Sequence, residues 1–151
     1  MTVTTDRTAP PVPALRELIS PELFDRVASR AAVEHSMPAE MAERSLTQSL
    51  TMLHAIATHR GTTIYPPRVI DVTWHMLILH TADYIALCDR LAGHYLHHTP
   101  ADGATDGGAN VRASAAALRD LGYEIDEELW AMIEATNCEN ACGGCDNKVP
   151  S

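Results

Sequence analysis

The stretch DVTWHMLILHTADYIALCDRLAGHYLHHTP, residues 71–100, indicates the fold class of this chain. Its first ten residues, 71–80, are apolar on nearly every side of a helix, which is typical of a buried central helix. Thr81 can begin a second helix. The apolar stripe of that second helix consists of Tyr84, Cys88, Leu91 and Tyr95. Two successive helices, the first of them buried, predict a helical protein.

The segments before and after this stretch follow helical patterns as well. Ser20 is a candidate N-cap because Pro21 occupies the first helical position after it. Gly61 is a candidate stop for the longest helix, since glycine commonly follows the last helical residue. Besides a short helix from Ala14, the patterns predict helices at about 21–35, 38–60, 110–121 and from Asp126 onward. We therefore expect one all-α domain of five or six helices.

The composition supports a helical domain with disordered ends. Apolar residues make up 46% of the 151 residues, which is enough for a core, and aromatic residues are few. Runs of β-branched residues are rare, which favours helices over strands. We expect a disordered lead at 1–13, a helical domain at 14–136 with a Gly-rich loop at about 101–109, and a Cys-rich tail at 137–151.

Charge and hydropathy limit the partners and the compartment. The formal net charge of −9 argues against nucleic acid as the ligand, because phosphate contacts need a basic surface. No stretch reaches the roughly 18 apolar residues that a membrane span requires. Residues 1–13 lack the basic start and the apolar core of a secretory signal. We therefore expect a cytoplasmic protein, in which clustered cysteines serve as ligands or redox-active thiols.

Three of the four cysteines lie in the segment CENACGGC, residues 138–145. Cys138, Cys142 and Cys145 have the spacing C-x₃-C-x₂-C, and the two glycines before Cys145 let a short loop wrap one ion. Thiolates bind zinc and iron–sulfur clusters, so the tail predicts a Zn site or an Fe–S cluster. Radical S-adenosylmethionine enzymes use the same spacing, but they need a large α/β barrel that this chain is too short to form.

Three other interpretations of the tail remain open. Cys142 and Cys145 form a C-x-x-C pair, which can cycle between dithiol and disulfide. The tail can also be a flexible end whose thiols stay reduced. Alternatively, a partner enzyme modifies the tail, and residues 14–136 serve as the recognition domain.

Histidines between residues 75 and 98 are the candidates for a further ligand, namely His75, His97 and His98. Asp71 precedes His75 by one helical turn, so its carboxylate can accept the imidazole N–H and fix the tautomer. That arrangement suits a metal ligand or a general base, and it equally suits a buried histidine satisfied by its neighbour. His94 and His98 are four residues apart, a spacing at which two imidazoles on one helix can share an ion.

The stretch 71–100 also resembles the glycine-rich-domain-protein-like family, a domain of unknown function found in bacteria and plants. The resemblance rests on an Asp-x-x-Trp-His start, a central Tyr and Cys, a His-His-x-Pro end and the later segment LGYEIDEELW at 121–130. The matching residues of the stretch are Asp71, Trp74, His75, Leu79, Thr81, Tyr84, Cys88, Gly93, His97, His98 and Pro100. The resemblance implies an α-helical domain and brings no established activity with it.

The sequence thus predicts a small cytoplasmic metal- or iron–sulfur-binding protein with a sensing, storage or accessory role. Cys138, Cys142 and Cys145 would be ligands, and a histidine from the 75–98 region would complete the set. The first alternative is a scaffold whose Cys-rich tail a partner enzyme modifies. The second is an enzyme that uses His75 as a general base. A partner enzyme or regulatory protein is expected, and the sequence does not indicate an oligomeric state.

Overall fold

The structure is a computed structural model that describes residues 9–99 and 106–133 of the 151. In these ranges the chain forms seven helices, of which five have 12 or more residues. Their bounds are α1 Val12–Arg16, α2 Pro21–Glu34, α3 Ala39–Thr58, α4 Arg68–Leu79, α5 Thr81–Ala92, α6 Ala109–Asp120 and α7 Glu127–Trp130. The prediction of an all-α fold is confirmed, and the described residues contain seven helices where five or six were expected.

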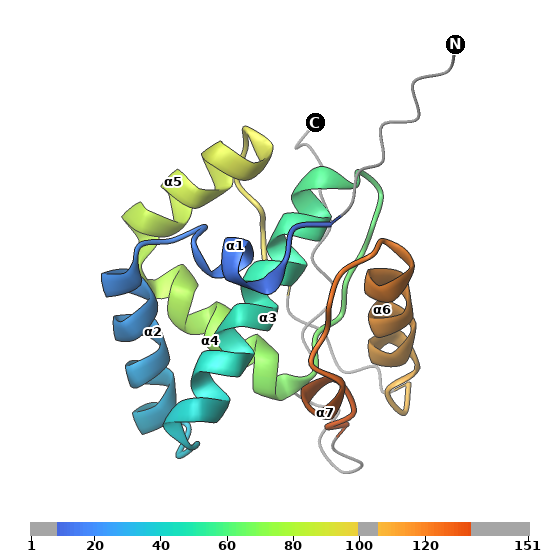
Figure 1. Ribbon diagram of the computed structural model, residues 1–151, viewed down its shortest axis with the longest axis horizontal. Coiled ribbons are helices and arrows are strands. Elements are labelled where there is room, and N and C mark those ends of the chain that lie inside the picture. Colours follow the sequence, from blue (N-terminus) through green and yellow to red (C-terminus); the bar gives the residue numbers. More distant parts are fainter. Residues whose placement is uncertain (1–8, 100–105, 134–151) are drawn as a thin grey trace.

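Helix α3 is the centre of the fold (Figure 1). Twelve of its 20 residues are buried, and it packs against α1, α2, α4 and α5. Figure 1 shows α2 on one side of α3 and α6 and α7 on the other, while α4 crosses behind α3. A helix surrounded in this way needs apolar residues around most of its circumference, which the 38–60 pattern supplies.

Two predicted helix starts are confirmed by their capping bonds. Ser20 Oγ accepts a hydrogen bond of 3.2 Å from the backbone N–H of Leu23, with Pro21 at the first helical position. The Asp126 carboxylate accepts one of 3.2 Å from the backbone N–H of Leu129 and so begins α7. Each bond satisfies a backbone donor that the first turn of a helix would leave unpaired.

Buried hydroxyl groups attach α4 to α3. Ser49 Oγ lies 2.8 Å from Thr73 Oγ1, and both hydroxyls donate to the carbonyl oxygen of Ile70, at 3.0 and 2.8 Å. Ser49 and Thr73 are fully buried, so these bonds compensate for the loss of water around two polar groups. Helix α4 begins at Arg68, three residues before the predicted start at Asp71, because the backbone of Pro67 provides the N-cap position.

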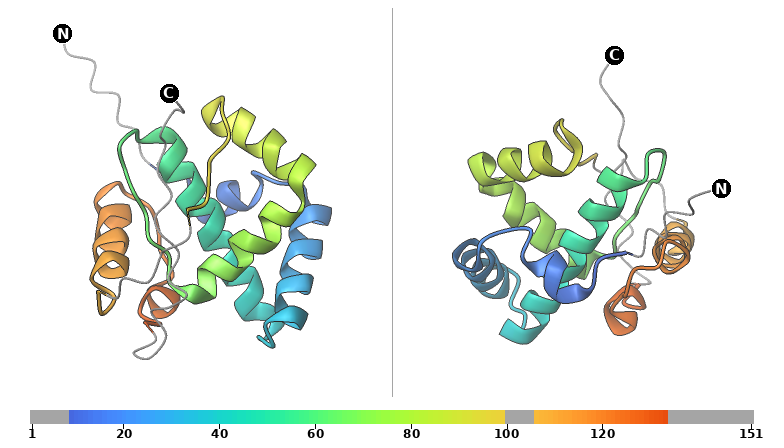
Figure 2. Two further views of the ribbon diagram at one scale, coloured as in Figure 1. Left: turned by 180° about the vertical axis from the view of Figure 1, so that it is seen from behind. Right: turned by 45° about the horizontal axis from the view of Figure 1, so that its top comes forward.

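Helix α5 ends at Ala92 and is capped by Gly93, whose φ of 76° lies in the left-handed region that glycine adopts without steric cost. The chain then leaves the helix, and residues 94–99 run back towards α4 (Figures 1 and 2). The side chain of Leu96, in the middle of this segment, is buried. The segment carries His97 and His98 past the side of α4 that bears Asp71.

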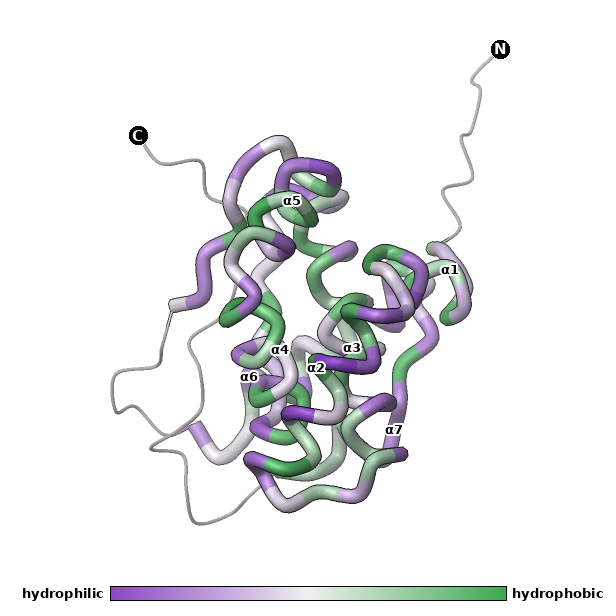
Figure 3. The backbone as a smooth tube through the Cα atoms, turned by 90° about the vertical axis from the view of Figure 1, so that its left-hand side faces the viewer, coloured by the Kyte–Doolittle hydropathy of each residue, from purple (hydrophilic) through white to green (hydrophobic). Residues whose placement is uncertain are grey.

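Hydrophobic and hydrophilic residues alternate along the coil of the helices (Figure 3), as expected for helices that each bury one side. Within the described residues, none of the helices combines the length and the apolar character that crossing a membrane requires.

Candidate metal centre

Helix α4, which is predominantly apolar, presents Asp71 and His75 on one side. Asp71 lies in its first turn and His75 follows one turn later. Residues four apart on a helix are neighbours on its surface, and here Asp71 Oδ2 lies 3.3 Å from His75 Nε2. The predicted pairing of this aspartate with this histidine is confirmed.

His98 joins this pair from the segment that follows α5. Its Nε2 atom lies 2.8 Å from Asp71 Oδ1 and 2.7 Å from His75 Nε2. The three side chains, which we call the Asp71–His75–His98 cluster, therefore bring two imidazole nitrogens and a carboxylate to one point. Both rings use Nε2, the atom furthest from the backbone.

The cluster has three contacts, Asp71–His75, Asp71–His98 and His75–His98, and hydrogen bonds do not satisfy all three at once. Each imidazole Nε2 carries at most one hydrogen, which can point at only one acceptor. If both Nε2 atoms are protonated, both can donate to Asp71, but the two N–H groups then face each other across 2.7 Å. If only one is protonated, its single hydrogen serves one of the three contacts and the other two have none. A metal ion bound by both nitrogens and the carboxylate would satisfy all three ligands together.

The geometry fits a small divalent ion. Zinc bonds imidazole nitrogen and carboxylate oxygen at about 2.0–2.2 Å, so the ligand atoms around a tetrahedral ion lie roughly 3.3–3.6 Å apart. The 3.3 Å separation of Asp71 Oδ2 and His75 Nε2 already lies in this range. The contacts of 2.7 and 2.8 Å that His98 Nε2 makes with His75 and Asp71 would widen by about 0.5–0.9 Å when an ion enters. Two imidazoles and one carboxylate also form the 2-His-1-carboxylate set that holds iron(II) with open positions.

The cluster is buried on one side and open on the other. The side chains of Asp71 and His98 are 3% and 10% exposed, whereas that of His75 is 42% exposed. Burial lowers the pKa of His75; the charge of Asp71 opposes this shift, and the charges of His98 and His35 add to it. The neutral imidazole, which is the form that binds metal, is therefore favoured at His75.

Trp74 and Tyr84 hold His98 in place. The fully buried indole of Trp74 packs on the His98 ring, with centroids 4.1 Å apart and planes 31° from parallel. Its Nε1–H donates to the Tyr84 hydroxyl at 3.1 Å, and that hydroxyl donates to the carbonyl oxygen of Leu96 at 2.7 Å. These bonds fix the backbone two residues before His98, as outer partners do in metal sites.

The structure brings together two of the histidines predicted as ligands, His75 and His98. The third, His97, is exposed, and its ring lies 4.7 Å from that of Tyr95. The proposed pairing of His94 and His98 on one helix is wrong, because α5 ends at Ala92 and neither residue is helical. Cys138, Cys142 and Cys145 lie outside the described residues.

The sequence interpretation assigned Asp71 a supporting role, whereas the structure places its carboxylate among the ligand atoms. The Asp-x-x-x-His spacing within an apolar helix was the available signal for it. Cys88 is buried in the core, as the helical stripe indicated, and burial raises the pKa of its thiol.

Comparison with known proteins identifies a family and no individual relative. No curated protein and no solved structure matches the chain. A family model described as UCP032817-like matches residues 16–119, more than two thirds of the chain. The matched range contains all three residues of the Asp71–His75–His98 cluster and excludes the Cys-rich tail. The chain therefore belongs to the UCP032817-like family.

Proposed function

We propose that this protein binds a divalent first-row transition metal through Asp71, His75 and His98. The observation that carries the proposal is the convergence of two imidazole nitrogens on the two oxygens of one carboxylate, with contacts of 2.7, 2.8 and 3.3 Å, in a pattern that hydrogen bonds within the cluster leave incompletely satisfied. The burial of the Asp71 carboxylate adds weight, since a buried charge is stable only when it is paired or bound to a metal.

Imidazole and carboxylate together suit zinc, iron(II) and neighbouring ions, and geometry selects among them. Three protein ligands leave at least one coordination position for water or for a donor from another molecule. The exposed side of His75 is where that position would meet solvent. Such an open centre agrees with the sensing or accessory role expected from the sequence, and it also allows metal-assisted hydrolysis.

A pocket of about 380 Å³ lies beside the N-terminal part of α4. Val72 of α4, Met37 and Met132 contribute to its apolar lining, and Arg68 and His35, whose charge acts on His75, are its polar members. Pockets of this size accept small ligands. Neither Asp71, His75 nor His98 lines it, so it is separate from the candidate metal centre.

The test compares two neighbouring histidines. The test uses the full-length protein with Cys138, Cys142 and Cys145 replaced by serine, which we call the serine-tail protein. These replacements prevent the tail thiols from competing for the metal. The serine-tail protein should bind one Zn²⁺, and His98→Ala should weaken binding by about 100-fold or more because one of three ligands is lost. His97→Ala is the matched control and should bind as the parent does. Equal affinities of the two variants, measured by competition with a chromophoric chelator, would reject the proposal.

The Cys-rich tail remains a second predicted metal site, supported by its C-x₃-C-x₂-C spacing. The protein purified without oxygen should then carry Zn, or Fe with absorption near 400 nm. Cys142→Ser should lose that metal and leave the Zn²⁺ bound by the Asp71–His75–His98 cluster. Metal content unchanged by Cys142→Ser would exclude the tail as a ligand set. A mass change of the tail in the native host would instead support its modification by a partner enzyme.

A general-base role of His75 is the second candidate function. Burial lowers the pKa of His75, which favours the neutral imidazole that a base requires, and the Asp71 carboxylate is placed to accept a hydrogen bond from its N–H. In a screen of ester and phosphoester substrates, this mechanism predicts activity that survives chelators and is lost in His75→Ala. Activity that disappears on chelation and returns with Zn²⁺ or Fe²⁺ would favour the metal centre.

The cytoplasm remains the compartment that we expect for this protein, and a regulatory protein or partner enzyme remains the expected partner. The resemblance to the glycine-rich-domain-protein-like family agrees with the helical fold and rests on the motif at 71–100, which contains every residue of the Asp71–His75–His98 cluster.

A further inference from the structure

The side-chain amide of Gln48, on α3, has only one possible orientation. Its Oε1 atom lies 2.9 Å from the indole nitrogen of Trp130 and 3.1 Å from the backbone nitrogen of Asp126. Both of these groups are donors and neither can accept, so the atom that faces them must be the amide oxygen. The Nε2 amino group of Gln48 is therefore forced to the opposite side.

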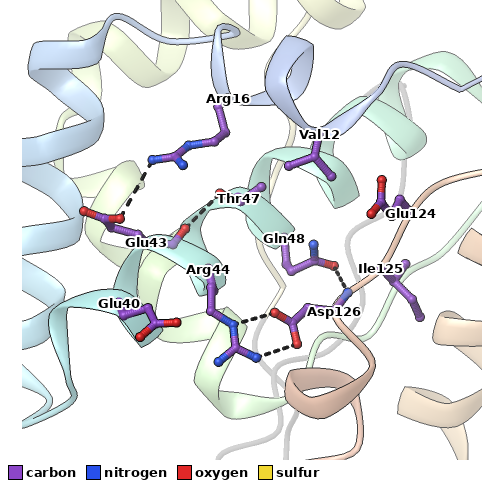
Figure 4. Close-up of a pocket in the computed structure, with 10 residues that line it drawn as sticks. All are labelled: Val12, Arg16, Glu40, Glu43, Arg44, Thr47, Gln48, Glu124, Ile125 and Asp126. Atoms are coloured by element: carbon purple, nitrogen blue, oxygen red, sulfur yellow. Dashed lines mark hydrogen bonds and ion pairs between the residues drawn. The ribbon is translucent and has the colours of Figure 1, made fainter.

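That side opens into a pocket of about 460 Å³ between α1, α3 and the segment before α7 (Figure 4). Figure 4 shows the Gln48 nitrogen pointing away from Asp126, towards Val12. Gln48 itself is only 4% exposed, and none of the described residues accepts a hydrogen bond from its Nε2. The Nε2 group faces the pocket, where it can donate to a ligand that brings an acceptor oxygen.

The remaining polar lining of the pocket is predominantly acidic. Glu40, Glu43, Glu124 and Asp126 contribute four carboxylates, against the two guanidinium groups of Arg16 and Arg44. Arg44 is already occupied, because it donates two hydrogen bonds of 2.7 and 2.8 Å to Asp126.

Arg16 is also engaged, since its guanidinium lies over the ring of Phe24 and 4.0 Å from Glu43. Within the described parts of the chain, Glu40 and Glu124 form no ion pair. The pocket thus combines one inward-facing amide donor with unpaired carboxylates at its edges, and it lies in a protein whose formal charge is −9.

We propose that this pocket binds a basic amino-acid residue, either free or within a peptide. The carbonyl or carboxylate oxygen of the ligand accepts from Gln48 Nε2, and its side-chain cation lies at Glu124, the unpaired carboxylate on the same side of the pocket as that nitrogen (Figure 4). The methyl groups of Val12 and Ile125 give the aliphatic part of the side chain an apolar wall. The net negative charge attracts a cationic ligand from a distance. The proposal is independent of the metal centre.

Three small probes separate the two recognition elements. Nα-acetyl-L-arginine N-methylamide has both the carbonyl and the cation, its citrulline counterpart lacks the cation, and butylguanidine lacks the carbonyl. The first should bind at least about tenfold more tightly than either of the others, since each lost interaction removes roughly 1.4 kcal/mol or more. It should also shift the side-chain amide NMR signals of Gln48. Equal binding of all three probes, or no shift of the Gln48 signals at millimolar concentrations, would overturn the proposal.

Variants locate the site, and free L-arginine tests the source of the ligand. Gln48→Glu keeps an acceptor for Trp130 and Asp126 but replaces the donor, so it should weaken binding of the acetylated probe about tenfold. If Gln48→Glu does not fold, Glu40→Gln combined with Glu124→Gln on the exposed rim serves the same purpose and should lower the affinity and its salt dependence.

Glu22→Gln, in the exposed first turn of α2, is the matched control. It should change neither the affinity for the acetylated probe nor the salt dependence of that affinity. Binding unaffected by the rim variants would reject the site. Tighter binding of free L-arginine than of the blocked probe would indicate a free amino acid, and the reverse would indicate a peptide.

Discussion

His98 Nε2 lies 2.8 Å from Asp71 Oδ1, although 27 positions separate the two residues in the chain. The short distance results from two features of the fold. The left-handed backbone of Gly93 ends α5, and the following segment returns along α4. The bonds among Trp74, Tyr84 and Leu96 then fix that segment. The candidate metal centre thus depends on a helix stop as much as on the ligands themselves.

Asp71→Asn should remove most of the stabilisation that a bound metal confers. Asparagine keeps the size of the side chain but loses the charge that a divalent ion requires of this site. With Zn²⁺ at about 100 times its Kd, the free energy of unfolding of the serine-tail protein should rise by about 2.7 kcal/mol. The rise should fall below about 1 kcal/mol in Asp71→Asn. Urea unfolding with and without Zn²⁺ measures the gain in the free energy of unfolding for each protein. Asp83→Asn in α5 is the control and should keep the gain of the parent. Equal gains in the two variants would contradict a role of Asp71 as ligand.

Tyr84→Phe should destabilise the protein by about 1–3 kcal/mol, because it leaves the buried indole N–H of Trp74 and the carbonyl of Leu96 without their hydroxyl partner. It should also weaken Zn²⁺ binding, since His98 follows Leu96 by two residues. Chemical unfolding and chelator competition measure the two effects. Tyr95→Phe keeps the ring contact with Tyr84 and should leave Zn²⁺ affinity unchanged. Unaltered metal affinity in Tyr84→Phe would show that the hydroxyl supports the fold alone.

Gly93→Ala should cost about 1 kcal/mol of stability, because alanine is strained at a φ of 76°. A Cβ atom at this position would meet no atom within 4 Å, so the cost is conformational and not steric. Gly93→Asn should cost less, since asparagine tolerates the left-handed region better. Thermal unfolding of the three proteins tests this order. A larger loss in the asparagine variant would exclude backbone strain as the cause.

His54 should make the protein less stable as the pH falls below 7. Burial lowers the pKa of His54 below its ordinary value of 6.5, and the charge of His59 adds to the shift. The unfolded chain therefore takes up the proton first, so the free energy of unfolding decreases from about pH 7 towards the lower folded-state pKa. His54→Gln should flatten this dependence, measured by urea unfolding with EDTA present. His97→Gln, at an exposed site, should keep it. A steeper dependence in His54→Gln would contradict the stated sign.

Much of the fold was predictable from local patterns in the sequence. Ser20 and Asp126 begin helices because their side chains accept from the backbone three residues later, an interaction that depends only on neighbours in the chain. The same holds for the pairing of Asp71 and His75, which follows from one helical turn. The start of α4 was missed by three residues, because the backbone of Pro67 fixes it and not the apolar pattern.

The sequence by itself determined the helical fold and the pairing of Asp71 with His75, because helix periodicity and capping act over four residues or fewer. Only the tertiary structure decided which histidine joins them. His97 and His98 are adjacent in the chain, and the path of the segment after Gly93 brings only His98 to Asp71. The orientation of the Gln48 amide likewise depends on donors 78 and 82 positions away. Contacts at such separations follow from how the helices pack, which no short sequence pattern encodes.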